Sequence, residues 1–234
     1  MRLSLALDPD VKVLLPDGST HNLADYLMPS ALLMLAALML MISMFLPYWS
    51  MKMTAPQYPK GLRVNVYVNH LEGDMREIDE LNHYLGMPEL DKGGQLERSI
   101  SFVAIIVLGL LLVAGVFIHN QWAAIIALPV LAYPIIFLAD LFYILYQYGH
   151  SIDPKSALGS AIKPFTPPLL GEGKVGQFGT IANFEIGFYL VLLSVVLVLI
   201  ALWFHRAAYK PLADARKRVR EQKAISLNVA TEAH

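Results

Sequence analysis

The sequence predicts an all-α integral membrane protein with four transmembrane helices and a small extracytoplasmic cap of one strand and one helix. Hydrophobic residues make up 56% of the 234 residues and charged residues only 16%, against about 45–50% and about 25% in soluble domains. The apolar residues are gathered in four blocks, each long enough to cross a hydrocarbon core of about 30 Å as a helix. These observations exclude a soluble enzyme, a secreted module and a disordered chain.

The pattern divides the chain into eight segments. A mostly polar extension covers residues 1–26, and the spans cover 27–51, 100–118, 122–146 and 184–205. Long loops cover 52–99 and 147–183, and a basic tail covers 206–234. Residues 11–15 predict a short strand in the extension, followed by a turn. The first block does not follow a basic, cleavable leader pattern, so we expect a retained anchor.

Lys and Arg near the span ends predict the orientation, because such residues are retained on the cytoplasmic side. The tail is rich in them, whereas the loop at 147–183 holds only three lysines. We therefore expect a multi-pass protein of the bacterial inner membrane with both termini cytoplasmic and both long loops periplasmic. The basic residues expected to meet lipid head groups are Arg206, Lys210, Arg216, Lys217, Arg218 and Arg220.

The first long loop has the pattern of a folded cap. Val64, Val66 and Val68 alternate with other residues, which predicts a strand. Asp74 with Glu77 has the spacing of a capping box, and apolar residues then recur at helical spacing. Gly86 and the following Pro88 predict the end of that helix.

Candidate metal ligands occur in both loops: His70, His83, Met87, His150 and Asp153. Imidazole and thioether suit copper, and imidazole with carboxylate suits zinc. None of these residues forms a recognised metal-binding spacing, so structural hydrogen bonding is the alternative. With no cysteine in the sequence, iron–sulfur clusters and covalent c-type haem are excluded, while the cofactor stays unknown and copper possible.

One acidic residue, Asp140, interrupts the third span. A carboxylate at this depth is costly unless it is paired or protonated, so it indicates a function or an interhelical hydrogen bond. Tyr143 lies three residues further on and could hydrogen-bond it. His119 and His205 lie at helix ends, where interfacial anchoring is favoured over haem ligation.

Several segments together resemble a known family. These are residues 55–62 (APQYPKGL), 71–74 (LEGD), 77–78 (EI), 81–87 (LNHYLGM), 148–154 (YGHSIDP) and 164–168 (PFTPP). They resemble a family of small four-helix bacterial membrane proteins of uncertain function, often encoded near nitrous oxide reductase and copper-maturation genes. The resemblance extends over residues 30–205 and implies a setting of copper-dependent respiration.

The leading hypothesis is a non-enzymatic accessory protein that serves assembly, metal supply or anchoring of a copper-dependent or respiratory redox enzyme. Its partners would be the lipid bilayer and a larger membrane or periplasmic redox protein, and no nucleic acid. One alternative is a structural subunit of a multi-subunit oxidase or respiratory complex. Another is a small transporter or quinone-binding protein that uses Asp140. We find no motif for independent catalysis.

Overall fold

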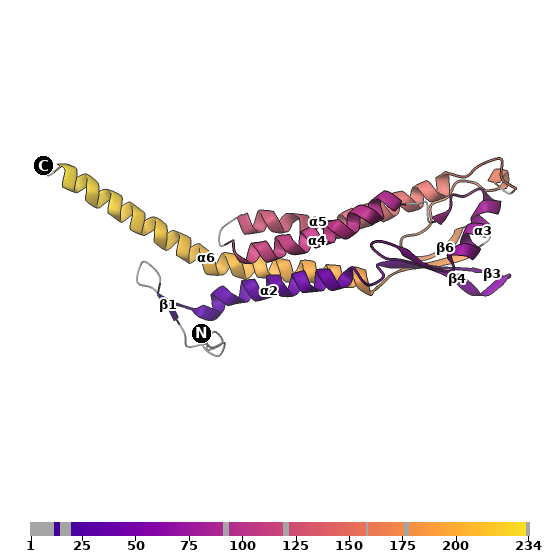
Figure 1. Ribbon diagram of the computed structural model, residues 1–234. Helices are drawn as coiled ribbons and strands as arrows, with labels where there is room; N and C mark the ends of the chain where they lie inside the picture. Colours follow the sequence, from indigo (N-terminus) through magenta and orange to yellow (C-terminus); the bar gives the residue numbers. More distant parts are fainter. Residues whose placement is uncertain are drawn as a thin grey trace. The chain divides into compact units, whose positions relative to one another are not determined.

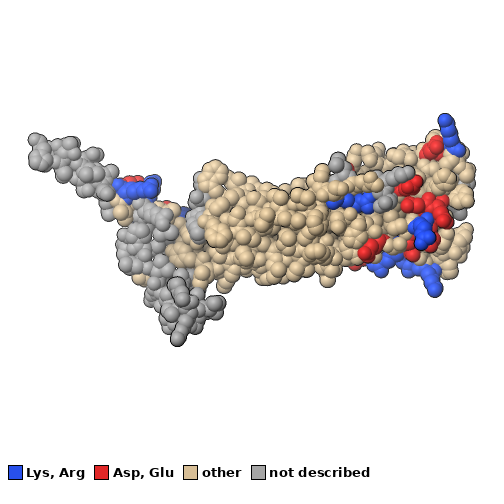
Figure 2. All heavy atoms as spheres, viewed as in Figure 1, with Lys and Arg blue, Asp and Glu red and all other residues tan. Residues whose placement is uncertain are grey.

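The computed structural model describes residues 12–14, 20–90, 94–118, 122–157, 159–175 and 178–232. Within these residues, four helices are long and apolar enough to cross a membrane, as predicted. They are α2 (Leu23–Ser43), α4 (Gln95–Val116), α5 (Trp122–His150) and α6 (Ile186–Glu232). In Figure 2 the visible surface of these helices is largely free of charged side chains outside the C-terminal part of α6.

The first helix is shorter than the predicted span at 27–51. Helix α2 ends at Ser43, and Trp49–Met51 belong to strand β3 (Trp49–Ala55). Pro47 lies between the two elements and lacks the N–H that a continuing helix needs. The last helix is longer than the predicted span, because α6 continues without interruption through most of the predicted tail.

The cap is a five-stranded antiparallel sheet, so the prediction of an all-α chain with one strand in its first loop was incomplete. The first loop provides β3, β4 (Tyr58–Val66) and β5 (Leu71–Gly73). The second loop provides β6 (Gly171–Val175) and β7 (Phe178–Phe184), after a short 3-10 turn at Gly159–Ala161. The strand order is β5-β4-β3-β7-β6, which joins the two loops through β3 and β7 (Figure 1).

The two faces of the sheet differ in chemistry because side chains alternate along each strand. The inner face presents apolar residues, which pack with Ile78 of α3 and with Leu141 and Leu145 of α5 in one buried cluster. The sheet residues in that cluster are Trp49, Met51, Leu62, Val64 and Ala182. The opposite, outer face carries exposed residues such as Lys52 and Arg63.

Helix α3 (Met75–Leu85) begins after Asp74 and ends before Gly86, as the sequence predicts. The predicted capping role of Asp74 is wrong, because its side chain makes no cap hydrogen bond. Its Oδ2 instead accepts a hydrogen bond from the backbone N–H of Arg63 at 2.8 Å. Gly86 has a φ of 75°, and its N–H donates to helix carbonyls. Glycine adopts this left-handed conformation at little cost.

The chain forms two compact units. The sheet unit comprises Ala37–Leu110 and Pro129–Val195, and the helix unit comprises Met1–Ala36, Leu111–Leu128 and Val196–His234.

Within the helix unit, the predicted N-terminal strand is present as β1 (Lys12–Leu14) and pairs with β2 (Thr20–Asn22). His205 Nε2 lies 3.0 Å from the carbonyl oxygen of Ile118, whereas His119 lies outside the described residues.

Candidate functional site

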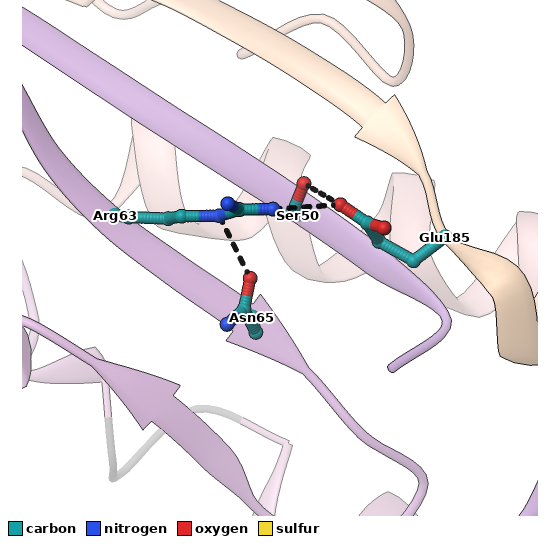
Figure 3. A network of polar contacts seen from close by, with 4 residues as sticks. All are labelled: Ser50, Arg63, Asn65 and Glu185. Atoms are coloured by element: carbon teal, nitrogen blue, oxygen red, sulfur yellow. Dashed lines mark hydrogen bonds and ion pairs between the residues drawn. The ribbon is translucent and has the colours of Figure 1, made fainter. Parts of the chain in front are cut away.

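A polar network on the outer face joins the two loops (Figure 3). One carboxylate oxygen of Glu185, just after β7, accepts a hydrogen bond from Ser50 Oγ at 2.6 Å and forms an ion pair with Arg63 at 2.9 Å. The Nε of Arg63 donates to Asn65 Oδ1 at 3.1 Å. Ser50 is buried, whereas Arg63 remains exposed, so the network extends from the interior of the sheet to solvent.

A row of exposed residues crosses the outer face beside this network. Arg63 of β4 lies opposite Lys52 of β3, Lys52 lies opposite Ile181 of β7, and Ile181 lies opposite Glu172 of β6. All four are exposed. We call these four residues the outer row. Like charges directly opposite each other destabilise a strand pair, and the outer row contains such a pair in Lys52 and Arg63.

The first candidate metal ligand, His70, has neighbours on its own loop. Its ring stacks on Tyr67 with centroids 4.4 Å apart. Nδ1 lies 2.7 Å from Asn69 Oδ1, and Nε2 lies 3.2 Å from Glu72 Oε1. Both ring nitrogens of His70 therefore have partners on the same loop. The neighbouring Tyr67 phenol has a raised pKa, mainly because of desolvation and then because of the hydrogen bond and charge of Glu72.

The candidates on and after α3 separate from each other. His83 lies next to Tyr84 in an edge-on ring contact, with centroids 6.3 Å apart, on the exposed side of the helix. Met87 is buried, and its backbone N–H donates to the Asn82 carbonyl at 2.8 Å. Met87 therefore belongs to the packing that closes the helix C-terminus.

The candidates of the second loop have structural partners as well. His150 stacks on Tyr146 with centroids 4.0 Å apart, and its Nδ1 lies 2.9 Å from the Tyr146 carbonyl oxygen. Asp153 Oδ1 accepts from the Lys155 N–H at 2.9 Å, and the Asp153 N–H donates to the Gly86 carbonyl at 2.7 Å. The end of α3 and the start of the second loop therefore meet, through backbone atoms.

Among the residues that the structure describes, no group of three or more His, Asp or Glu side chains is arranged to hold a metal ion. The predicted ligands are divided between the Tyr67 loop, the exposed side of α3 and the C-terminus of α5. The structure thus brings the two loops together, but it does so through strand pairing and backbone hydrogen bonds.

Asp140 lies on α5 and lines a cavity of about 150 Å³ inside the sheet unit. The inner faces of β3 and β4 form its wall together with α3, α4 and α5. Glu97 and Arg98 of α4 line the same cavity and, like Asp140, are partly buried. Tyr143, predicted as a partner of Asp140, instead accepts a hydrogen bond from Gln147 Nε2 at 2.6 Å.

Two buried side chains near the end of α2, Ser43 and Tyr48, are joined by their hydroxyl groups. Ser43 Oγ donates to the Leu40 carbonyl at 2.6 Å and lies 2.8 Å from the Tyr48 hydroxyl. Since Ser43 uses its only hydrogen on Leu40, Tyr48 donates to Ser43. Burial raises the pKa of Tyr48.

The predicted head-group residues lie on α6. Arg206, Lys210, Lys217, Arg218 and Arg220 are in this helix, and Lys217 approaches Glu221 at 3.9 Å. Arg216 lies in the same helix, and its side chain is outside the described set. An exposed ion pair of this kind contributes little to stability.

Sequence reasoning identified Asp140 of the cavity wall, but it did not single out Ser50, Glu185 or the other residues of that wall as parts of a site. Ser50 lies within the apolar block that the sequence assigns to the first span. Glu185 lies at the start of the last predicted span. The alternation of Trp49, Met51 and Met53 is the signal that could have revealed β3 and hence the inner face.

No protein-family model matches this sequence, and no curated protein matches it either.

Proposed function

We propose that the protein is a non-enzymatic accessory protein of the bacterial inner membrane that anchors or assembles a larger redox enzyme. The four apolar helices would hold it in the bilayer, and the outer face of the sheet would contact the partner. Because the basic C-terminal part of α6 favours the cytoplasmic side, we place the sheet on the periplasmic side. The copper-dependent or respiratory nature of the partner rests on the family resemblance of the two loops.

The observation that carries this proposal is the outer row. Lys52 and Arg63 lie directly opposite each other, an arrangement that costs up to about 1 kcal/mol on an exposed strand pair. Glu185 pairs with Arg63, and no carboxylate among the described residues pairs with Lys52. An acidic patch on a partner would offset this repulsion, and the exposed Ile181 beside it would add an apolar contact.

The fixed shape of the sheet supports docking. The central strand β3 pairs with β4 on one side and with β7 on the other. Ser50 and Arg63 both reach Glu185, which ties the two loops side chain to side chain. A preorganised surface loses little conformational entropy when a partner binds.

Metal supply is the part of the hypothesis that the arrangement of the loops supports least. His70 and His150 already contact groups of their own loops. Metal delivery through His83 and His150 stays a prediction. Replacement of both by alanine should abolish bound copper and leave the protein inserted if that prediction is correct.

The test is affinity purification of the full chain from native membranes in mild detergent, with identification of co-purifying chains and measurement of bound metal on the same sample. We expect a larger redox protein to co-purify at low ionic strength. Lys52→Glu should reduce its recovery severalfold. Lys155→Glu, an equal charge change at an exposed position of the second loop, should leave recovery unchanged.

The outcomes separate the hypotheses. Recovery that is equal for Lys52→Glu and Lys155→Glu would refute docking through the outer row. A fixed stoichiometry of partner chains that survives high salt would identify a structural subunit of a complex. Copper near one ion per chain without stoichiometric partners would instead favour delivery.

A further inference from the structure

The cavity beneath the sheet has the composition of a small-molecule site. Its walls are mostly apolar, and several are aromatic: Trp49, Tyr67, Tyr133, Phe137, Tyr148 and Phe178. Its volume is about 150 Å³, the size at which an apolar protein cavity accommodates one benzene-sized molecule. An aromatic ring therefore fits it better than a bulky polycyclic ligand does.

The cavity wall also includes a few polar groups, as the walls of ligand sites do. Asp140 of α5 and Glu97 of α4 both line it, so the wall carries two carboxylates. Arg98 lines it too, and its Nε–H donates to the Gly94 carbonyl at 3.3 Å. A ligand in this cavity that carries a hydrogen-bond donor would give a carboxylate of the wall a partner.

Asp140 also stands out by its position within an apolar helix. A carboxylate in a membrane-spanning segment is expensive and marks a ligand or ion site more often than a packing site.

We propose that this cavity binds a single aromatic ring that carries a hydroxyl group, the chemistry of phenols and hydroquinones. The ring lies among the aromatic and aliphatic walls, and its hydroxyl donates to the carboxylate of Asp140. This assignment concerns the inner side of the sheet and does not depend on docking through the outer row.

The test uses the full chain in detergent and the fluorescence of Trp49, which lines the cavity. The chain has three tryptophans, so Trp122→Phe with Trp203→Phe leaves Trp49 as the only indole. The probe is 4-bromophenol, whose bromine quenches a nearby indole. Bromobenzene is the matched probe, because it has the same ring and bromine without the hydroxyl.

We expect saturable quenching by 4-bromophenol and at least about fivefold weaker binding of bromobenzene, the loss expected for a hydrogen bond to a charged group. Asp140→Asn should weaken the binding of 4-bromophenol to a similar degree and leave the binding of bromobenzene unchanged. Glu172→Gln, an exposed carboxylate of β6 outside the cavity, is the control and should bind as the parent does. Leu145→Phe should fill the cavity and lower the affinity for both probes.

Three results would overturn the proposal. One is quenching that rises linearly and equally with both probes, which reports only partition into the micelle. Another is saturable binding that is equal for the two probes, and the third is binding that Asp140→Asn leaves unchanged. These comparisons remain decisive if Leu145→Phe fails to fold. Hydroquinone with and without a decyl tail is then allowed to compete with 4-bromophenol. This comparison shows whether the natural ring reaches the cavity from the membrane or from solution. Stronger competition by the tailed molecule indicates a membrane-borne ring, and equal competition indicates a free phenol.

Discussion

The indole Nε1 of Trp49 donates a hydrogen bond to the backbone carbonyl of Leu169 over 2.7 Å. Trp49 belongs to β3 of the first loop, and Leu169 precedes β6 in the second. Trp49 is almost completely buried, and the hydrogen bond to Leu169 is partly buried. It fixes the segment that precedes β6 against the centre of the sheet.

Replacement of Trp49 by phenylalanine should destabilise the protein by about 1–3 kcal/mol, because the Leu169 carbonyl would lose its donor and the smaller ring would leave a gap in the buried cluster. Thermal unfolding in detergent, followed by circular dichroism, would measure the effect. Trp203→Phe is the matched control, since Trp203 is 66% exposed. Equal midpoints for the two variants would contradict the structural role of the indole.

Gly86→Ala should destabilise the sheet unit through two causes. The residue has a positive φ, and an added Cβ would lie against Ser156 and within 2.6 Å of the Asp153 carbonyl oxygen. Gly171→Ala is the control, because Gly171 also has a positive φ but open space around its Cβ position. Both variants carry the conformational cost of about 1 kcal/mol, so the extra loss in Gly86→Ala measures the steric contact. A smaller loss for Gly86→Ala than for Gly171→Ala would refute it.

The Glu185 network predicts that its buried arm matters more than its exposed arm. Ser50→Ala removes a hydrogen bond from a buried hydroxyl to a carboxylate and should cost about 1.5–3 kcal/mol. Arg63→Gln removes a surface ion pair and should cost no more than about 1 kcal/mol, with a dependence on salt. Chemical denaturation at two salt concentrations would test the order. A larger loss for Arg63→Gln would show that the ion pair dominates.

The raised pKa of Tyr48 predicts a loss of stability in alkali. Burial raises its pKa in the folded protein above the usual value of 10.0, so the unfolded chain releases this proton first as the pH rises. The contribution of Tyr48 to the free energy of unfolding is therefore constant below about pH 10 and falls above it. Tyr48→Phe should reduce the alkaline slope in unfolding experiments between pH 8 and 12. An unchanged slope would contradict this assignment.

The sequence predicts the helices well because their signal is local. Blocks without central charges predict four spans, and Gly86 correctly predicts the end of α3. Strand β3 was missed because Trp49 and Met51 are apolar and continue the apolar block of the first predicted span. Strands β6 and β7 were missed because Gly171, Gly173 and Gly179 resemble turn residues. Their stability comes from pairing with β3, which no local pattern encodes.

The candidate site illustrates the same limit. Asp140 was identified because a single carboxylate in an apolar span is conspicuous in sequence. Its neighbours on the cavity wall come from β4, α3 and α4, and only the folded chain brings them together. The histidines were weighed as ligands by residue type, but their partners, such as the Tyr146 carbonyl at His150, depend on local geometry.

The central position of β3 also constrains how the protein is made. One neighbour of this strand, β4, follows it directly in the chain, but the other, β7, is separated from it by two helices that are long and apolar enough to cross a membrane. During synthesis, one edge of β3 therefore presents unpaired N–H and C=O groups until α4 and α5 have been produced. Such an open edge invites pairing with other chains. Newly made copies depend on prompt completion of β7, and delay at that step would expose a strand prone to aggregation.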